Sequence, residues 1–348
     1  SIGWLITTTF FAIMLALGLG LVFGVGRNAY LSIDGLDTTT FQSKVTSFSE
    51  IFINFFPRNV ISDIAEENTI PMIFTAILVA YVFVAHDNEE KVKSFKNLVE
   101  ALKEIIFKIL DWVIELTPYA VLTLVATSVG NGINSSGMIW SLVMLLIVCF
   151  IAFIIDSYLI NAVLLKVFAK VNPIKFFKKI LPAQIVAFST QSSAGTLPVA
   201  TEILTDKIGV SGKVANVTTP LGTTIGMPGC AGIWPILVSL YGIYGLGINF
   251  SLTDYITLVV VALFVSFGTA GVPGTATVTT ASVLTVMGLP LELIVLTIPI
   301  SALADTGRTA TNITGAMVSA TIVARQEDSL DDEIFEKEDE EENKAVTA

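Results

Sequence analysis

The sequence predicts an all-α protein that crosses a membrane several times, and three observations support that prediction. Hydrophobic residues make up 53% of the 348 residues and charged residues only 14%, whereas a typical soluble domain has about 25% charged residues. Several segments stay apolar over about 18 residues or more, the length that a membrane helix needs. Two apolar segments are interrupted in the same way, by glycine, proline and small polar residues.

The predicted membrane segments start at the beginning of the chain. They are residues 2–25, 70–85, 105–129, 138–167, 214–244, 257–285 and 291–323. Residue 1 is not Met and no charged leader precedes the first segment, so we expect further helices before it. Lysines cluster within residues 86–104 and 166–179, and the positive-inside rule predicts that these loops face the cytoplasm.

The negative charge of the chain is concentrated near its C-terminus. The net charge is −11, and eleven acidic residues lie within residues 327–342. A dense acidic run with few apolar residues does not bury enough surface to fold, so we predict that residues 326–348 form a disordered cytoplasmic tail. Its charge argues against nucleic acid as a partner.

The sequence contains no motif of an enzyme or of a metal centre. His86 is the single histidine, and the two cysteines, Cys149 and Cys230, do not form a CxxC pair. Neither HExxH nor GxSxG occurs. We therefore expect neither catalysis nor a bound cofactor.

A pair of opposite charges stands inside the last apolar segment. Asp305, Arg308, Thr309 and Asn312 have the spacing i, i+3, i+4 and i+7, so they share one face of a helix. A charge inside a bilayer costs about 3 kcal/mol or more unless it is paired or faces a polar cavity. Arg308 can bind a carboxylate through its planar fork, and Asp305 can accept from an ammonium. The face suits a zwitterion, although an ion pair that only stabilises the bundle is an alternative.

Two interrupted apolar segments are predicted to form helical hairpins, near residues 180–208 and 255–287. Their centres read STQSSAGTLP at residues 189–198 and GTAGVPGTAT at residues 268–277. Non-helical backbone is tolerated within a membrane only where protein buries it or water lines it, so each tip is expected to face a cavity. An apolar segment with glycine and small polar residues follows each hairpin. This duplication is typical of transporters that bind substrate near the middle of the bilayer.

At these motifs the chain resembles the dicarboxylate/amino acid:cation symporters, the family of the prokaryotic and neuronal glutamate transporters. STQSSAGTLP and GTAGVPG are similar to the two hairpin tips of that family, and DTGRTATNITG, from Asp305, is similar to its substrate helix. The resemblance implies a homotrimer in the bilayer with an elevator mechanism. It assigns residues 1–25 and 131–325 to the mobile transport domain, and residues 26–130 to an extracellular loop and the scaffold and trimerisation helices.

The resemblance also implies roles for individual residues. Arg308 would bind a substrate carboxylate, Asp305 the ammonium, and Thr309 and Asn312 the remaining polar groups, with Cys230 as a small apolar side chain in the wall. The hairpin tips would close over the substrate through groups around Gln191, Ser192, Ser193, Ala194, Val272, Pro273, Gly274 and Thr275.

The chain departs from the family pattern at the cation sites. Residues 226–229 read GMPG where the family usually has NMDG, Ala316 replaces an aspartate, and Ser301 replaces a further acid. Hard cations prefer anionic oxygen ligands, so two sodium sites of the family are expected to be lost or weakened. A third site would survive at Thr224, Met227, Ser266 and Thr269. Coupling to fewer sodium ions, or to protons, follows as a hypothesis.

The same departures resemble the bacterial branch of the family that takes up L-cystine. That branch has a similar GCAGI(Y/W)P run, here at residues 229–235, and a small residue before Met317. Cystine is longer than glutamate, and the missing side chains at Gly226 and Ala316 would make room for it. The sequence therefore predicts an L-cystine symporter of a bacterial inner membrane. An acidic amino acid or a C4 dicarboxylate is the alternative substrate, and a substrate-gated anion channel is the alternative class of function.

Overall fold

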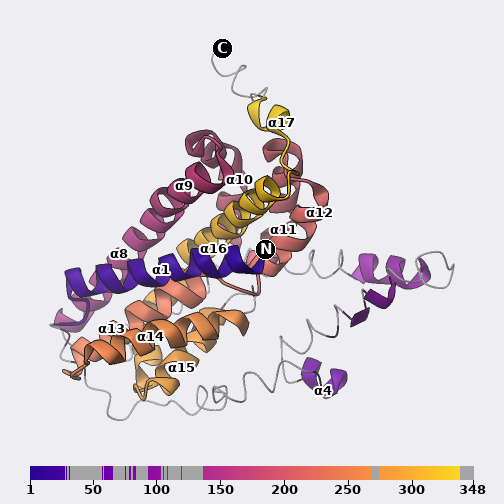
Figure 1. Ribbon diagram of the computed structural model, residues 1–348. Coiled ribbons are helices and arrows are strands. Elements are labelled where there is room, and N and C mark those ends of the chain that lie inside the picture. The colour runs from indigo at the N-terminus through magenta and orange to yellow at the C-terminus, as the bar shows by residue number, and fades with distance from the viewer. Residues whose placement is uncertain are drawn as a thin grey trace.

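Helix α16, Glu292–Gln326, runs through the middle of the computed structural model and packs against most of its other helices (Figure 1). The structure describes residues 1–27, 29, 31, 57, 59–65, 75, 78–79, 81–83, 93–102, 105, 108, 119, 136–268, 271 and 274–337. Over these residues the chain forms helices and one isolated β-bridge, without a β-sheet. The all-α prediction is therefore confirmed for the described part of the chain.

Three helices of the described residues are long and apolar enough to cross a membrane: α1 (Ile2–Phe23), the helical run Ile139–Ala169, and α16. That run comprises α8 (Ser136–Ile154), α9 (Asn161–Leu164) and two π-helical turns, η1 (Ile155–Ile160) and η2 (Leu165–Ala169). The predicted segments at residues 70–85 and 105–129 lie largely outside the described residues, which between α1 and α8 include the short helix α4 (Val60–Ala65).

The first hairpin consists of α10 (Pro173–Thr190) and α11 (Ser193–Ile203), which continues into the π-helical turn η3 (Leu204–Ile208). Asn172 caps α10, because its Oδ1 accepts from the Ile174 amide at 3.0 Å and the Lys175 amide at 3.4 Å. Pro173 at the first helical position fits this start. The hairpin therefore begins before residue 180, where the apolar pattern had suggested its start.

The tip of the first hairpin is only two residues long. Gln191 turns the chain with a left-handed φ of 54°. Ser192 then caps α11 by accepting from the Gly195 amide at 3.0 Å through its Oγ. Both residues of the tip therefore have a capping role: one ends α10 and the other begins α11.

The predicted segment 214–244 is a broken helix. It contains α12 (Gly212–Gly222), the π-helical turn η4 (Pro228–Ile233) and α13 (Trp234–Gly245). The break lies where Gly226 has φ +65° and a Cβ would stand 2.6 Å from the Leu5 carbonyl oxygen, so only glycine fits there. The second hairpin follows, with α14 (Leu252–Val265), the 3₁₀ turn η5 (Ser266–Gly268) and α15 (Thr275–Val286).

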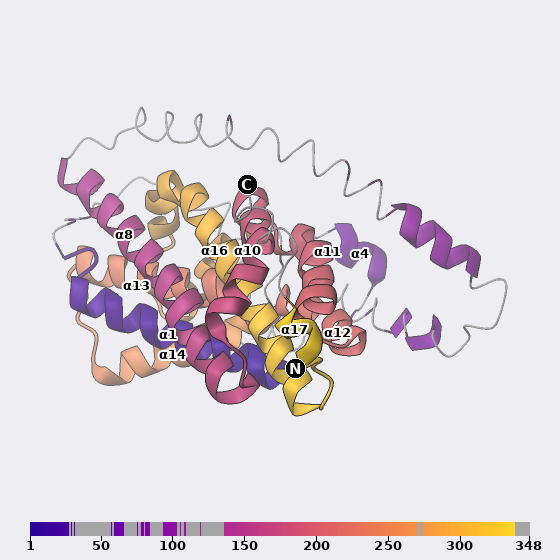
Figure 2. The same cartoon turned by 90° about the horizontal axis from the view of Figure 1, so that it is seen from above.

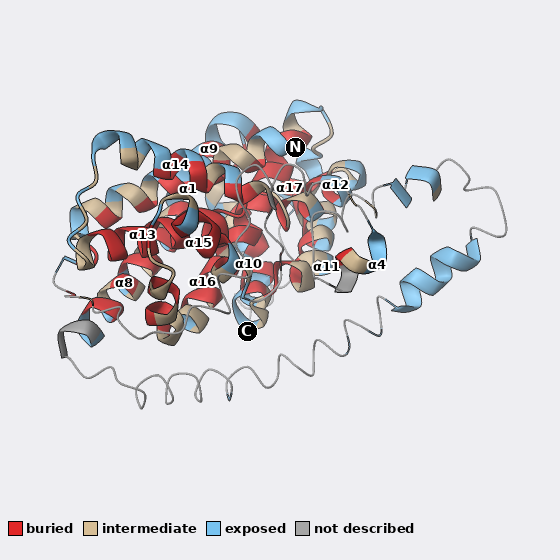
Figure 3. Cartoon of the chain, turned by 90° about the horizontal axis from the view of Figure 1, so that it is seen from below, coloured by how far each residue is buried: buried red, intermediate tan, exposed pale blue. Residues whose placement is uncertain are grey.

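The hydrophobic core has two parts that α16 joins. The first half of α16, up to Ala304, packs with α1, α8, α13, α14 and α15, whereas its second half, from Ile313, packs with α10, α11 and η2. Figures 1 and 2 place α13 and α14 near one end of α16 and α11 and α12 near the other. Buried residues fill the body of this bundle, as Figure 3 shows. The polar stretch from Asp305 to Asn312 lies between the two cores.

The structure differs from the expected disordered tail over residues 326–337. After α16 the chain pairs Leu330 with Val210 in the β-bridge and forms helix α17 (Asp332–Glu336). Phe335 is only 1% exposed and packs in the second core. Lys179 is buried and donates to the main-chain oxygens of Phe335 at 2.8 Å and Lys337 at 3.0 Å. One aromatic side chain among the acids thus anchors this segment, and residues 338–348 lie outside the described residues.

Candidate functional site

Asp305 and Arg308 form a buried ion pair between the two cores. Arg308 Nη2 lies 3.1 Å from Asp305 Oδ1, and the two residues are 1% and 5% exposed. Gly307 lies between them, and a Cβ there would stand 2.5 Å from the Phe153 ring, so glycine allows α8 to pack closely at this point. The helical spacing thus brings the two charges together, as the sequence predicts.

Arg308 is held by more than its acidic partner. Nη2 donates to the Ser301 carbonyl at 2.8 Å, one turn back along α16, and its Cζ lies 4.6 Å from the centroid of the Trp234 ring. The Nε and Nη1 atoms are buried and have no hydrogen-bond partner among the residues that the structure describes. A buried guanidinium with unpartnered N–H groups is costly, so the side chain retains a strong capacity to bind an anion.

The two hairpin tips meet beside this pair. The Ala194 amide donates to the Gly271 carbonyl at 3.0 Å, and Ser192 Oγ lies 3.5 Å from the same oxygen. On the second hairpin the Gly274 amide donates to Asp305 Oδ2 at 3.3 Å. Gln191 and Ser192 form the first tip, Ser193 begins α11, and Thr275 begins α15. Val272 and Pro273 lie outside the described residues.

Asn312 faces η4. Its Oδ1 accepts from the Gly229 amide at 2.8 Å and the Cys230 amide at 3.3 Å, two donors that a helix start leaves unpaired. Its Nδ2 donates to Cys230 Sγ at 3.1 Å and to Met227 Sδ at 3.5 Å. Asn312 therefore joins α16 to η4 in this structure, and Thr309 Oγ1 donates to the Asp305 carbonyl within its own helix at 2.8 Å.

The residues expected to bind a cation lie near the break between α12 and η4. The Gly226 amide donates to the Ser266 carbonyl at 3.0 Å, which brings η5 beside the break. Thr224 Oγ1 and Ser266 Oγ donate to carbonyls of the preceding turn, at 3.1 and 2.6 Å. Met227 Sδ accepts from Asn312. Thr269, the remaining predicted ligand, lies outside the described residues, so the site stays a prediction.

Gly226 and Ala316 do not open space in this structure, contrary to the expectation for a long substrate. A Cβ on Gly222 would stand 2.5 Å from the Ala316 Cβ, so α12 packs directly on α16 there. Gly226 packs on the Leu5 main chain in the same way. Small residues at these two positions allow close helix packing.

Trp234 is the contact of Arg308 that the sequence analysis missed. It lies at the start of α13, far from α16 in sequence, and its side chain is 2% exposed. Tryptophan in a membrane protein is usual at the bilayer interface, and no spacing rule links residues 234 and 308. Only the close approach of η4 to α16 brings them together: a Cβ on Gly229 would stand 2.4 Å from the Arg308 carbonyl oxygen.

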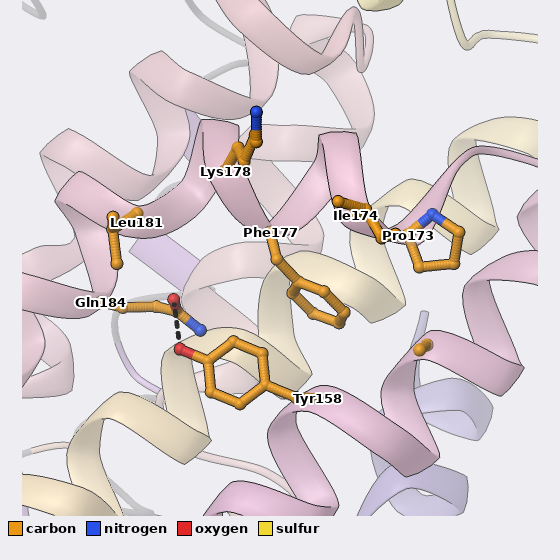
Figure 4. A pocket seen from close by; sticks show the side chains of 8 residues that line it. Tyr158, Pro173, Ile174, Phe177, Lys178, Leu181 and Gln184 are labelled. Atoms are coloured by element: carbon orange, nitrogen blue, oxygen red, sulfur yellow. Dashed lines mark hydrogen bonds between the residues drawn. The ribbon is translucent and has the colours of Figure 1, made fainter.

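A separate groove of about 430 Å³ lies on the face of η1, α9 and α10. Tyr158, Phe177, Lys178 and Gln184 are among its lining residues, and Tyr158 donates to Gln184 Oε1 at 3.0 Å (Figure 4). Neither Asp305 nor Arg308 lines it. The groove is therefore distinct from the charged site, although Gln184 Nε2 donates to Thr314 on α16 at 2.8 Å.

Comparison with known proteins agrees with these motifs. Residues 1–326 match the sodium:dicarboxylate symporter family. An uncharacterized symporter of Haemophilus influenzae is 37% identical over 285 residues, which cover 79% of this chain and 63% of that protein. The L-cystine uptake protein TcyP of Bacillus cereus is 32% identical over 301 residues, covering 84% of this chain and 64% of TcyP.

The TcyP protein of Shouchella clausii is likewise 32% identical, over 312 residues that cover 87% of this chain and 65% of that protein. The chain thus spans a little less than two thirds of the length of these curated relatives. The family match extends from α1 to the end of α16 and includes both hairpins and the charged pair. The chain belongs to the sodium:dicarboxylate symporter family.

Proposed function

We propose that this chain is part of a secondary active transporter that takes up L-cystine together with a coupling cation. The observation that carries the proposal is the state of Arg308, a fully buried guanidinium whose Nε and Nη1 atoms have no hydrogen-bond partner in the described part of the chain. Each of these N–H groups could donate to a substrate carboxylate oxygen, and charge-assisted hydrogen bonds of this kind are among the strong ones.

Asp305 supplies the second half of the recognition. Its Oδ1 contacts Arg308 and its Oδ2 accepts from the Gly274 amide. An α-ammonium group placed between Asp305 and the second hairpin would gain a charge-assisted hydrogen bond where a neutral group would gain less. Asp305 and Arg308 would then bind the α-ammonium and the α-carboxylate of an amino acid. The hairpin tips, which meet at Gly271, would close over the bound substrate.

L-Cystine is the proposed substrate because two of the relatives are named L-cystine uptake proteins. The alternative is an acidic amino acid or a C4 dicarboxylate, which the family description favours. Asp305 opposes a plain dicarboxylate, since it would repel a second carboxylate beside the first. A substrate-gated anion channel is a further alternative, and it would carry current without a substrate gradient.

Family membership also supports a mechanism. We propose a homotrimer in a bacterial inner membrane, in which residues 1–25 and 131–325 move as a transport domain against a scaffold formed from residues 26–130. The two-part core joined through α16 suits such a moving unit, because α1 and both hairpins all pack on one central helix. Sodium or a proton would couple the movement to substrate.

Uptake by the full-length protein in proteoliposomes tests this function. Labelled L-cystine, L-glutamate and succinate are offered with sodium and proton gradients imposed separately. Saturable, gradient-dependent cystine uptake that unlabelled glutamate does not compete with is the expected result. Uptake of glutamate or succinate with cystine ignored would overturn the substrate, and substrate-dependent anion current without uptake would overturn the class.

A further inference from the structure

A second acidic side chain is buried inside a candidate membrane span, away from the Asp305–Arg308 pair. Asp156 lies in η1, within the helical run Ile139–Ala169, and is 1% exposed. The three candidate spans of the described residues contain two other acids. Asp305 is paired with Arg308, and Glu292 lies in the first turn of α16. Of the three acids in these spans, Asp156 is therefore the one that lies in the middle of a helix without a cationic side chain beside it.

The polar contacts of Asp156 come from one neighbour, Asn161, which the π-helical turn places beside it. Asn161 Nδ2 donates to the Asp156 carbonyl at 3.0 Å and lies 3.5 Å from its Oδ2. Asp156 Oδ1 is buried and has no hydrogen-bond partner among the described residues, and neither has the Oδ1 of Asn161, a residue that is also 1% exposed. An ionised carboxylate in this position is strongly disfavoured, whereas a neutral acid is tolerated and gains an O–H donor.

Among the described residues, the elements around η1 bring no charge into contact with Asp156. Helices α1, α8, α9 and α16 pack against η1, and α10 contacts it through Tyr158 and Gln184. The titratable and charged groups of these elements are Tyr158 in η1 itself, Cys149 on α8, Lys175, Lys178 and Lys179 on α10, and Glu292, Asp305, Arg308 and Arg325 on α16, whereas α1 and α9 have none. Within the described part of the chain, none of these groups forms a hydrogen bond or ion pair with Asp156.

The turn that holds Asp156 also touches the helix that holds the charged pair. Ser157 Oγ donates to Thr311 Oγ1 at 3.3 Å, and Thr311 Oγ1 donates to the Gly307 carbonyl at 2.8 Å. Thr311 lies between Arg308 and Asn312 on α16. Single π-helical turns inside longer helices occur frequently at functional sites. A change in the charge of Asp156 would therefore act on a turn that contacts the substrate helix directly.

We propose that Asp156 binds the proton that is coupled to transport, with Asn161 as its positioning residue. This inference rests on the proposed transport function and names its coupling site. The carboxylate takes up one proton from the outer solution, crosses as the neutral acid, and releases the proton to the inner solution. A proton suits the site better than a metal cation, because hard metal ions need about six oxygen ligands and two unpartnered oxygens are found here among the described residues.

The test compares the wild-type full-length protein with Asp156→Asn, Asp156→Glu and Asp254→Asn in sodium-free proteoliposomes. Asp254→Asn is the matched control, because Asp254 is an acid at the exposed start of α14 and asparagine also caps helices well. Cystine accumulation under an inward pH gradient and cystine exchange at equal pH are measured. A gradient of one pH unit supports at most about tenfold accumulation for each proton carried.

Asp156→Asn is expected to exchange cystine but not to accumulate it under the pH gradient. Asp254→Asn should accumulate cystine like wild type, and Asp156→Glu should retain part of the accumulation. Accumulation by Asp156→Asn equal to wild type would overturn the inference. So would a separate experiment at equal pH, with sodium added on one side, in which a sodium gradient alone drives accumulation by wild type.

A measurement without substrate separates this inference from the proposed function. A buried neutral acid must ionise as the pH rises, so the melting temperature of wild type in detergent should fall relative to that of Asp156→Asn as the pH rises above about 4, the usual carboxyl value. An unchanged difference across that range would overturn the role of Asp156. If wild type shows this pH dependence but takes up no cystine, the proposed substrate fails and the protonation site stands.

Discussion

The guanidinium of Arg308 lies against the ring of Trp234, with its Cζ 4.6 Å from the ring centroid. The indole covers the guanidinium, while Nη2 bonds to Asp305 and to Ser301. Arginine therefore keeps one orientation in which Nε and Nη1 remain unpartnered. This arrangement orients the side chain for an anion before the anion binds.

Replacement of Trp234 by leucine should weaken substrate binding. A cation–π contact contributes about 0.5–2 kcal/mol, which corresponds to roughly a twofold to thirtyfold loss of affinity. Substrate binding to purified protein measures the effect, and Trp234→Phe, which keeps an aromatic ring, should lose less than Trp234→Leu. Equal affinity for wild type and Trp234→Leu would show that the ring does not position Arg308.

Asp305→Asn should abolish amino-acid uptake, because the amide cannot neutralise an ammonium and leaves Arg308 buried without its acid. Removal of one partner of a buried ion pair costs about 3–5 kcal/mol. Arg308→Lys is the companion variant, since lysine keeps the charge but lacks the fork and should bind substrate more weakly. Uptake assays in proteoliposomes read out both, and unchanged uptake by Asp305→Asn would remove Asp305 from the site.

Asn312→Ala should destabilise the folded protein. The change leaves the amides of Gly229 and Cys230 without their acceptor, and an unsatisfied buried donor costs about 1–3 kcal/mol. Thermal unfolding in detergent gives the measurement. Asn216→Ala is the matched control, because Asn216 is exposed and its amide bonds to a carbonyl of its own helix. Equal melting temperatures for the two variants would contradict the role of Asn312 in holding η4.

Gly271→Ala should push the second hairpin tip away from the end of α12 and from the first hairpin tip. A Cβ at residue 271 would stand 2.6 Å from the Thr223 carbonyl oxygen and 3.3 Å from the Ala194 amide nitrogen. Overpacking of this kind costs about 1–3 kcal/mol, so substrate affinity should fall if the tips must meet over it. Gly18→Ala in α1 is the control, because nothing lies within 4 Å of its Cβ position. If both variants bind substrate like wild type, contact of the tips is not needed for binding.

The C-terminal segment should loosen in acid. Arg325 donates to both carboxylate oxygens of Asp332 and holds the pKa of that carboxyl below its usual value. Because the pKa is lowered on folding, the stabilisation is complete above the usual value of about 4 and is lost as the pH falls through the folded value. Both groups are partly exposed, so the effect is small.

Hydrogen exchange at the amides of Ser211 and Asp331, which join this segment to the end of the first hairpin, should accelerate as the pH falls, after correction for intrinsic rates. Asp332→Asn should remove most of that acceleration. Protection that falls equally in wild type and Asp332→Asn would assign the loosening to other acids of the tail.

Much of the fold was predictable because helical periodicity and bilayer length are local properties. The apolar runs predicted α1, α16 and the helical run from α8 to η2. The tip sequences predicted the two interruptions that form the hairpins. The broken segment between α12 and α13 was also visible as glycine and proline within an apolar run. The ordered α17 was not predictable, because the average acidity of the tail concealed the burial of a single residue, Phe335.

The sequence by itself determined that Asp305 and Arg308 meet, because residues three apart on a helix are neighbours whatever surrounds them. The tertiary structure decided what else they touch. Trp234 and Gly274 reach the pair from elements distant in sequence, and Asn312 contacts η4 because Gly229 lets the two backbones approach. The tertiary structure also uses Gly226 and Ala316 for close helix packing and leaves Oδ1 of Asp156 without a hydrogen-bond partner among the described residues. Such contacts depend on how whole helices pack, and no spacing along one chain segment encodes that.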